Sequence, residues 1–114
     1  MQKPSMNLRE KLCRDKSLLF EKLRKLAQDL KKKHPEIKEV FLFGSVARGD
    51  YGIKSDVDLL LVLKSSRKKR YFDRIPDYLD FEFPLEVEIF PFTEEELSKV
   101  PLASTALKEG IKLA

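Results

Sequence analysis

The chain has 114 residues, of which 42% are hydrophobic and 37% charged, and its formal net charge is +4. This balance fits one globular domain with a modest core and excludes a low-complexity chain. Its longest apolar runs are shorter than the roughly 20 residues that cross a bilayer, and no hydrophobic stretch follows the charged start. A chain with one cysteine, Cys13, cannot form an internal disulfide, so we expect a cytoplasmic protein.

The first third of the chain predicts a helix. Its leucines follow spacings of three, four and seven, and no Gly or Pro interrupts residues 5–34. Asn7 with Glu10 would cap the start, and Pro35 prevents continuation. The polar residues 14–17 offer an alternative break, but one long helix is the favoured interpretation.

Strands and helices alternate in the rest of the chain. Residues 37–43 predict a strand that runs into Gly44-Ser45, and residues 46–48 the first turn of a short helix before a loop at 49–55. The nearly all-aliphatic residues 57–63 predict a strand buried on both faces.

The later elements carry clearer end signals. Ser65 or Ser66 would cap a helix through residues 67–75, which Pro76 interrupts. Alternation predicts a strand at 85–90. Residues 93–96 form a capping box for another helix, and a last helix follows Pro101 and stops at Gly110. The order indicates an α/β (α+β) fold, a small mixed sheet with helices mainly on one face. We expect a single domain over residues 1–114, with a helical segment (1–34) and an α/β core (35–114).

Two carboxylates open the aliphatic strand. Asp56 and Asp58 are two residues apart, so on a strand they share a face, about 6.6 Å apart at Cα. Two like charges at the end of an apolar strand repel each other, and a divalent cation would relieve that cost. Carboxylate oxygens suit Mg²⁺. The alternative is that Asp56 caps the loop and Asp58 is an ordinary exposed residue.

Two further features would complete such a site. Gly44 allows close backbone approach, and the amides of a following helix turn with the Ser45 hydroxyl can hold an anion. Glu86 and Glu88 share one face of the later strand, so Glu88 reaches the aspartates if that strand pairs beside theirs. The alternative for both glutamates is a solvent-facing strand surface, which is the stronger interpretation for Glu86.

The segment GSVARGDYGIKSDVDLLLV resembles the signature of the nucleotidyltransferase superfamily that includes DNA polymerase beta and kanamycin nucleotidyltransferase. It is most similar to the minimal, single-domain members from archaea and bacteria. The pattern is Gly-Ser, then Ala-Arg-Gly, then Ser-Asp-x-Asp and an aliphatic strand. The later segment VEIFPFTEEEL resembles the strand that carries the third carboxylate and the helix after it.

The resemblance implies roles for individual residues. Gly44 and Ser45 hold a nucleoside triphosphate, and Asp56 and Asp58 bind two Mg²⁺ ions. Glu88 stands where the family usually has Asp, and would bind one metal or help deprotonate the acceptor. Arg48 is a further nucleotide-binding candidate, with a salt bridge to Asp50 or a solvated helix turn as alternatives.

The implied activity is Mg²⁺-dependent transfer of a nucleoside monophosphate, expected to be AMP from ATP, to a hydroxyl. The implied partner is a second copy or a small helical HEPN-type protein. In such pairs the transferase can be an antitoxin that adenylylates a tyrosine of its toxic partner.

Two rival functions remain open. The chain could neutralise a partner by binding alone, keeping only a weak nucleotide site. It could also bind RNA through residues 67–74 (RKKRYFDR), with Tyr71 and Phe72 as stacking residues. The favoured alternative for that segment is an amphipathic helix that buries Tyr71, Phe72 and Ile75.

Overall fold

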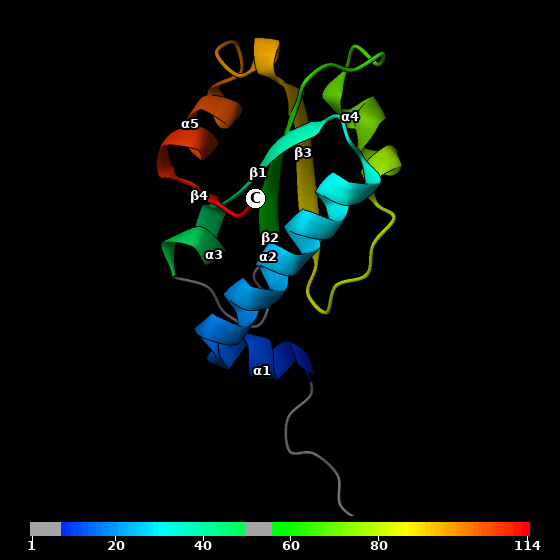
Figure 1. Ribbon diagram of the computed structural model, residues 1–114. Coiled ribbons are helices and arrows are strands. Elements are labelled where there is room, and N and C mark those ends of the chain that lie inside the picture. Colours follow the sequence, from blue (N-terminus) through cyan, green and yellow to red (C-terminus); the bar gives the residue numbers. More distant parts are fainter. Residues whose placement is uncertain (1–7, 50–55) are drawn as a thin grey trace, which may run out of the picture.

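The computed structural model describes residues 8–49 and 56–114. It is a four-stranded mixed sheet with helices on both faces, and the strand order is β3-β2-β1-β4 (Figure 1). β1 runs antiparallel to β2 and β4, while β2 and β3 are parallel. The predicted class, a small mixed sheet in an α/β fold, is therefore confirmed. The strands are β1 (Ile37–Phe43), β2 (Val57–Leu63), β3 (Val87–Thr93) and β4 (Ile111–Lys112).

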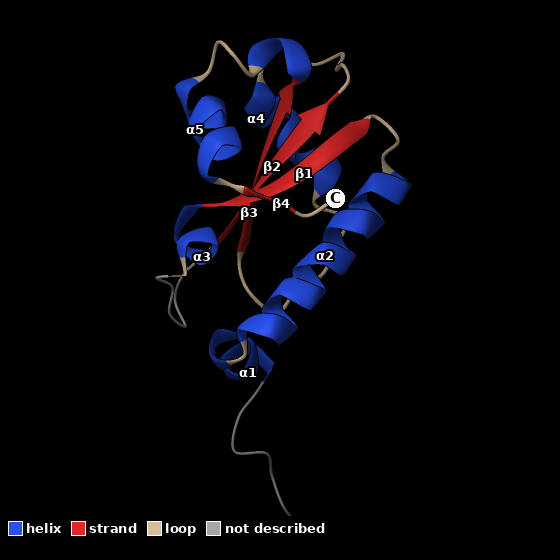
Figure 2. Ribbon diagram, turned by 60° about the vertical axis from the view of Figure 1, so that its left-hand side comes forward, coloured by secondary structure: helices blue, strands red, loops and turns tan. Residues whose placement is uncertain are grey.

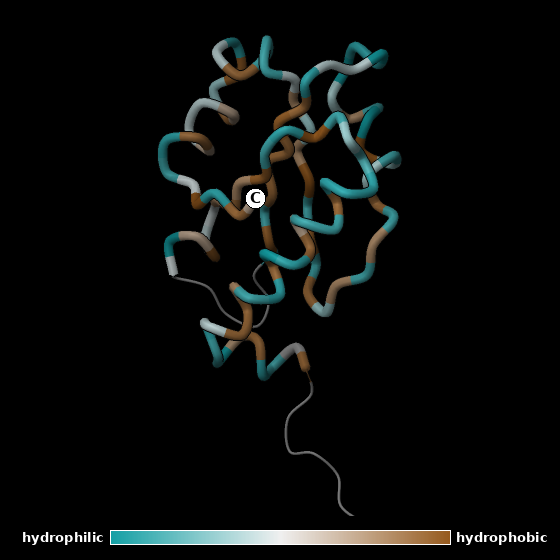
Figure 3. The backbone as a smooth tube through the Cα atoms, in the orientation of Figure 1, coloured by the Kyte–Doolittle hydropathy of each residue, from teal (hydrophilic) through white to brown (hydrophobic). Residues whose placement is uncertain are grey.

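β2 lies at the centre of the core. Every residue of β2 except Asp58 is buried, as its aliphatic sequence predicts for a strand covered on both faces. Val57, Leu59, Leu61 and Leu63 face one apolar cluster, and Leu60 and Val62 face the other. Figure 3 shows this strand as a largely hydrophobic segment in the middle of the molecule. Asp58 belongs by alternation to the Leu60 and Val62 face.

The two helices at the start of the chain cover one face of the sheet. They are α1 (Leu8–Arg14) and α2 (Lys16–Lys33), whose buried leucines belong to the same apolar cluster as the odd-numbered residues of β2. The prediction of one long helix is wrong, because the side chain of Asp15 accepts a hydrogen bond from the Leu18 amide at 3.1 Å and starts α2 afresh. Asn7, the expected cap of the N-terminal helix, lies outside the described residues.

The other face is covered by α5 (Pro101–Glu109), and Figure 2 shows α5 and α2 on opposite sides of the sheet. Ala103 and Ala106 pack on Leu60 and Val62. α5 begins after Val100 and ends before Gly110, as predicted. The short α3 (Gly44–Arg48) lies at one end of this face, and the loop predicted after it falls largely on residues 50–55, outside the described part.

The expected helix through residues 67–75 is wrong in its first half. Residues 64–70 form an exposed loop, and helix begins only with α4 (Tyr71–Arg74) and the 3₁₀ turn η1 (Ile75–Tyr78). Ser66 Oγ accepts from the Lys68 amide at 3.2 Å, which closes a tight turn in place of a helix cap. Phe72, expected to be buried, is 51% exposed.

The third strand and its turn are shifted from their predicted positions. β3 starts two residues later than predicted and continues to Thr93. The Thr93–Glu96 capping box is present, but it opens only the 3₁₀ turn η2 (Glu94–Glu96). Within the described residues, none of the helices is both long and apolar enough to cross a bilayer.

Candidate active site

Parallel pairing of β2 and β3 brings two acidic residues together. Asp58 and Glu88 are directly opposite each other in the ladder. Because cross-strand partners project to the same face of a sheet, the two carboxylates share the face that α5 covers farther along. Phe90 and Phe92 continue the Glu88 row, as Leu60 and Val62 continue the Asp58 row. The two acids therefore lie at the ends of two apolar rows, just beyond the part of the face that α5 covers.

Asp58 is the most perturbed carboxylate of this group. Its pKa is raised to about 6, chiefly by burial and then by the charges of Glu88 and Asp56, while the charge of Arg48 opposes the rise. Asp56 lies just before β2 and is exposed, as is Glu88. Three carboxylates thus influence one another at the starts of β2 and β3, which is the electrostatic setting that a cation relieves.

Gly44 lies against the Asp58 carboxylate, on the side where β1 ends. β1 ends at Phe43, which pairs with Asp58, and the next residue turns with φ +81° into α3. A Cβ at Gly44 would overlap Asp58 Oδ2 and lie 3.3 Å from its Cγ. Only glycine fits both the backbone angle and the close approach of the carboxylate. The glycine-serine bend and the aspartate strand are therefore in direct contact.

Ser45 and Arg48 lie on α3 next to this bend. Ser45 is the second residue of the helix and half-buried, whereas Arg48 is exposed in its last turn. The charge of Arg48 reaches Asp58, since it lowers the pKa of that group. The structure thus places all six sequence-predicted residues around the starts of β2, β3 and α3: Gly44, Ser45, Arg48, Asp56, Asp58 and Glu88.

The carboxylates surround the site without converging on one point. Across residues 8–49 and 56–114, no three His, Cys, Asp or Glu side chains lie close enough together to hold a metal ion. Asp56 and Glu88 are exposed, so they can change rotamer without repacking the core. A cation would have to draw them inward. Glu86 precedes β3 and is exposed, in keeping with the solvent-facing interpretation.

The structure also contains a polar cluster that the sequence did not predict. Arg74, in a basic run typical of surfaces, is only 3% exposed and forms an ion pair with Glu96 at 2.7 Å. Its ion-pair partner Glu96 is 22 residues away and the Pro91 carbonyl 17 residues away, so no local pattern could have shown its burial. This cluster lies at the far ends of β2 and β3, away from Asp58.

Comparison with known proteins agrees with this architecture. A family model of the nucleotidyltransferase domain matches residues 23–113. A Sulfolobus solfataricus protein assigned to the nucleotidyltransferases has a similar structure, with a TM-score of 0.66, 24% identity, and coverage of 96% of this chain and 90% of that one. A toxin-antitoxin structure with AMP-PNP gives a TM-score of 0.55 and 17% identity, covering 80% of this chain and 72% of that one. None of the curated protein sequences matches the chain significantly.

At these identities the two structures show a shared fold, whereas the family model covers most of the chain. The sequence that it matches contains the Gly44 bend, the Asp56 and Asp58 pair and the Glu88 strand. The chain therefore belongs to the nucleotidyltransferase domain family and is a nucleotidyl-transferring enzyme.

Proposed function

We propose that this enzyme transfers AMP from ATP to a hydroxyl acceptor in a Mg²⁺-dependent reaction. The observation that carries the proposal is the position of Asp58, opposite Glu88 in the ladder and against the Gly44 bend. The Asp58 carboxylate thus lies next to other acids on one side and next to a backbone turn on the other. A metal–polyphosphate complex needs both kinds of surface.

The acids fit a hard divalent cation. The pKa of Asp58 is raised by burial and by two neighbouring carboxylates, and Arg48 offsets this only in part, so the protein alone does not fully compensate the ionised form. Oxygen ligands from Asp56, Asp58 and Glu88, with substrate phosphates, form the donor set that Mg²⁺ prefers. When bound, Mg²⁺ would neutralise developing charge on the phosphate oxygens.

The nucleotide's phosphates would rest on α3. Its first-turn amides, the Ser45 hydroxyl and the Arg48 guanidinium are donors on the same side as Asp58. In the reaction the acceptor oxygen bonds to the α-phosphorus, and the bond from that phosphorus to the bridging oxygen breaks, which releases pyrophosphate. Glu88 is the candidate to take the hydroxyl proton, because it is exposed and stands beside Asp58.

We further propose a protein hydroxyl as acceptor, a tyrosine on a small helical HEPN-type partner, with this chain as the antitoxin. The support is the shared fold with a toxin-antitoxin protein whose structure contains AMP-PNP, an ATP analogue. The domain is small, so a partner, or a second copy of the chain, would supply the surface that grips the acceptor.

Label transfer tests the proposal. The chain is incubated with Mg²⁺, a cell extract as acceptor source and each of the four NTPs labelled at the α-phosphate. We expect label to move from ATP most efficiently, to require Mg²⁺ and to be lost in Asp58→Ala. Asp29→Ala, which removes an exposed carboxylate on α2, is the matched control and should transfer normally.

The rival of binding without turnover has a separate test. If the double variant of Asp56→Ala and Asp58→Ala still neutralises a toxic partner, control is by binding. If it fails while it still forms the complex, control is by chemistry.

A further inference from the structure

The link between β2 and α4 is an exposed basic loop. Residues 64–70 (KSSRKKR), here called the basic loop, contain five Lys or Arg and no acid. All seven residues are exposed. The loop follows the end of β2, so it lies at the opposite end of the sheet from α3 (Figure 1). Asp58 is near the start of β2 and Lys64 directly follows its end. At the usual rise of a strand, this separation of six residues spans about 20 Å.

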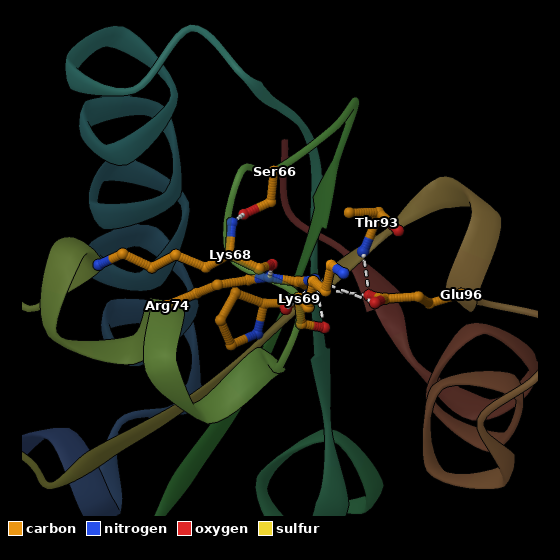
Figure 4. Close-up of polar contacts among 7 residues, drawn as sticks. Ser66, Lys68, Lys69, Arg74, Thr93 and Glu96 are labelled. Carbon is orange, nitrogen blue, oxygen red and sulfur yellow. Dashed lines mark hydrogen bonds and ion pairs between the residues drawn. The ribbon is translucent and has the colours of Figure 1, made fainter.

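A buried arginine holds the loop in place. Arg74 Nε donates to the Lys68 carbonyl at 2.9 Å, and its NH2 donates to the Lys69 carbonyl at 3.2 Å (Figure 4). Its remaining donors reach the Pro91 carbonyl and both carboxylate oxygens of Glu96. All five N–H groups of Arg74 are therefore used within the protein. The backbone at Lys68 and Lys69 is therefore fixed by contacts within the protein, which lowers the entropic cost of binding there.

The charges of the basic loop are mostly uncompensated. Lys68 pairs with Asp77 at 2.9 Å and Arg70 with Asp73 at 3.3 Å, and these exposed pairs are weak. In the part of the chain that the structure describes, no carboxylate lies within salt-bridge distance of Lys64, Arg67 or Lys69. A bound polyanion would therefore be stabilised by electrostatic attraction to these charges.

The loop borders a hollow suited to phosphate groups. The hollow has a volume of about 340 Å³, and Lys99 from the turn after η2 faces it with Lys64 and Lys69. Hydroxyl-bearing residues also line it. Two acids, Glu95 and Glu96, lie on its wall as well, and Glu96 is already paired with Arg74.

Ser65 and Ser66 also line a second hollow of about 360 Å³, in which Arg67 is the cation that has no carboxylate of the described chain at salt-bridge distance. The acids of this hollow are engaged within the protein, Asp77 with Lys68 and Glu36 with the Tyr78 hydroxyl.

An exposed aromatic ring lies beside Arg70, the last cation of the basic loop. Phe72 is 51% exposed, and the Arg70 guanidinium carbon lies 5.0 Å from the centre of its ring. An exposed aromatic ring beside a basic surface is the arrangement on which unpaired bases stack. An acidic protein surface would use the cations but would have no need of the exposed ring.

We propose that the basic loop and Phe72 bind single-stranded nucleic acid. The backbone phosphates lie along Lys64, Arg67, Lys69 and Lys99, and a base stacks on Phe72. The site is separate from the nucleotide-transfer site, so it stands whether or not the proposed ATP chemistry is correct.

The test is fluorescence anisotropy of the full chain with a labelled 20-nucleotide single-stranded RNA. A single-stranded DNA of the same sequence and an RNA duplex are run in parallel. We expect single strands to bind more tightly than the duplex, and salt to weaken binding steeply. The double variant of Arg67→Gln and Lys69→Gln should flatten the slope of log K against log salt by about 1.4, for two lost phosphate contacts. Phe72→Ala should weaken binding about tenfold, the loss of one stacked base.

Matched variants remove the same groups elsewhere. Arg24→Gln with Lys32→Gln takes an equal charge from exposed positions on α2, and Leu102→Ala removes an exposed apolar side chain on α5. Both should bind like the unaltered protein. The proposal is overturned if the α2 variant loses as much affinity as the loop variant, if the duplex binds as tightly as the single strand, or if polyglutamate of equal charge displaces RNA as well as unlabelled RNA does. The last result would identify an acidic protein as the ligand.

Discussion

Gly44 and Asp58 are in direct contact, and a side chain at residue 44 would occupy the space of the Asp58 carboxylate. The contact arises because the antiparallel pairing of β1 with β2 sets Phe43 opposite Asp58, and the chain then turns at Gly44. The bend that would hold phosphate and the strand that would hold metal are thus one unit.

Gly44→Ala should disable this unit, and Gly49→Ala provides the control. Both glycines have a positive φ, so alanine at either should cost about 1 kcal/mol of folding free energy. Only residue 44 faces Asp58, since the nearest atom to a Cβ at residue 49 is Lys16 Nζ at 3.6 Å. Urea denaturation should show this loss for both variants, with an added loss for Gly44→Ala because its Cβ must displace the Asp58 carboxylate. Mg²⁺-dependent ATP binding by calorimetry should fail only for Gly44→Ala. Equal binding by both variants would contradict the role of the contact.

Asp58 should make the metal-free protein less stable as pH rises. Its pKa is about 6 in the folded chain against 3.8 for an ordinary Asp, so folding favours the protonated form. The stability that protonation provides is complete below about pH 4 and lost as pH rises through 6. At this half-buried site, screening by water should limit the loss to about 1 kcal/mol.

Asp58→Asn should remove that pH dependence. In EDTA at pH 7.5 the variant should be about 1 kcal/mol more stable than the unaltered chain, with no such difference at pH 4. With Mg²⁺ and ATP the order should reverse, since only the unaltered chain gains from the ligand. Urea denaturation at both pH values measures the effect, and a variant that is less stable at pH 7.5 in EDTA would count against uncompensated charge at Asp58.

Label transfer should depend on the negative charge of Glu88 more than on the length of its side chain. The ladder sets the Cα of Glu88 directly opposite Asp58, so a shorter carboxylate still lies on the correct face. We expect Glu88→Asp to retain label transfer within about tenfold, and Glu88→Gln to lose about a hundredfold or more, the usual scale for a lost proton acceptor. Transfer rates under matched Mg²⁺ decide between them, and an active Glu88→Gln would exclude both proposed roles.

The Arg74–Glu96 pair should govern stability at the other end of the sheet. Glu96→Gln leaves a buried guanidinium without its charged partner, which should cost about 3 kcal/mol. Hydrogen bonding to Arg74 lowers the pKa of Glu96 from 4.5 to about 2, so this contribution is present above pH 4.5 and lost as pH falls toward 2. Acid titration of the unfolding free energy should therefore show a smaller drop in the variant. If the unfolding free energy falls equally with pH in both proteins, the Arg74–Glu96 pair does not contribute to stability.

The sequence predicted the elements whose signals are local. β1 and β2 are predicted by apolar runs, and α5 is bounded by Pro101 and Gly110. Spacing and strand periodicity indicated the site residues, and the resemblance supplied their expected roles. The strand pairing explains why Glu88 lies beside Asp58. The failures have a common origin, since competing hydrogen bonds decided the outcome. The Asp15 side chain divided the first helix, and Arg74 bound the carbonyls of residues 68 and 69 in place of a helix.

Calorimetric titration of ATP into the unaltered chain, with and without Mg²⁺, most directly tests whether Asp58 and its neighbours hold a cation-bound triphosphate. The account predicts binding that requires Mg²⁺, disappears in Asp58→Asn and persists in Asp29→Asn. Undiminished binding in Asp58→Asn, or equal affinity in EDTA, would contradict it.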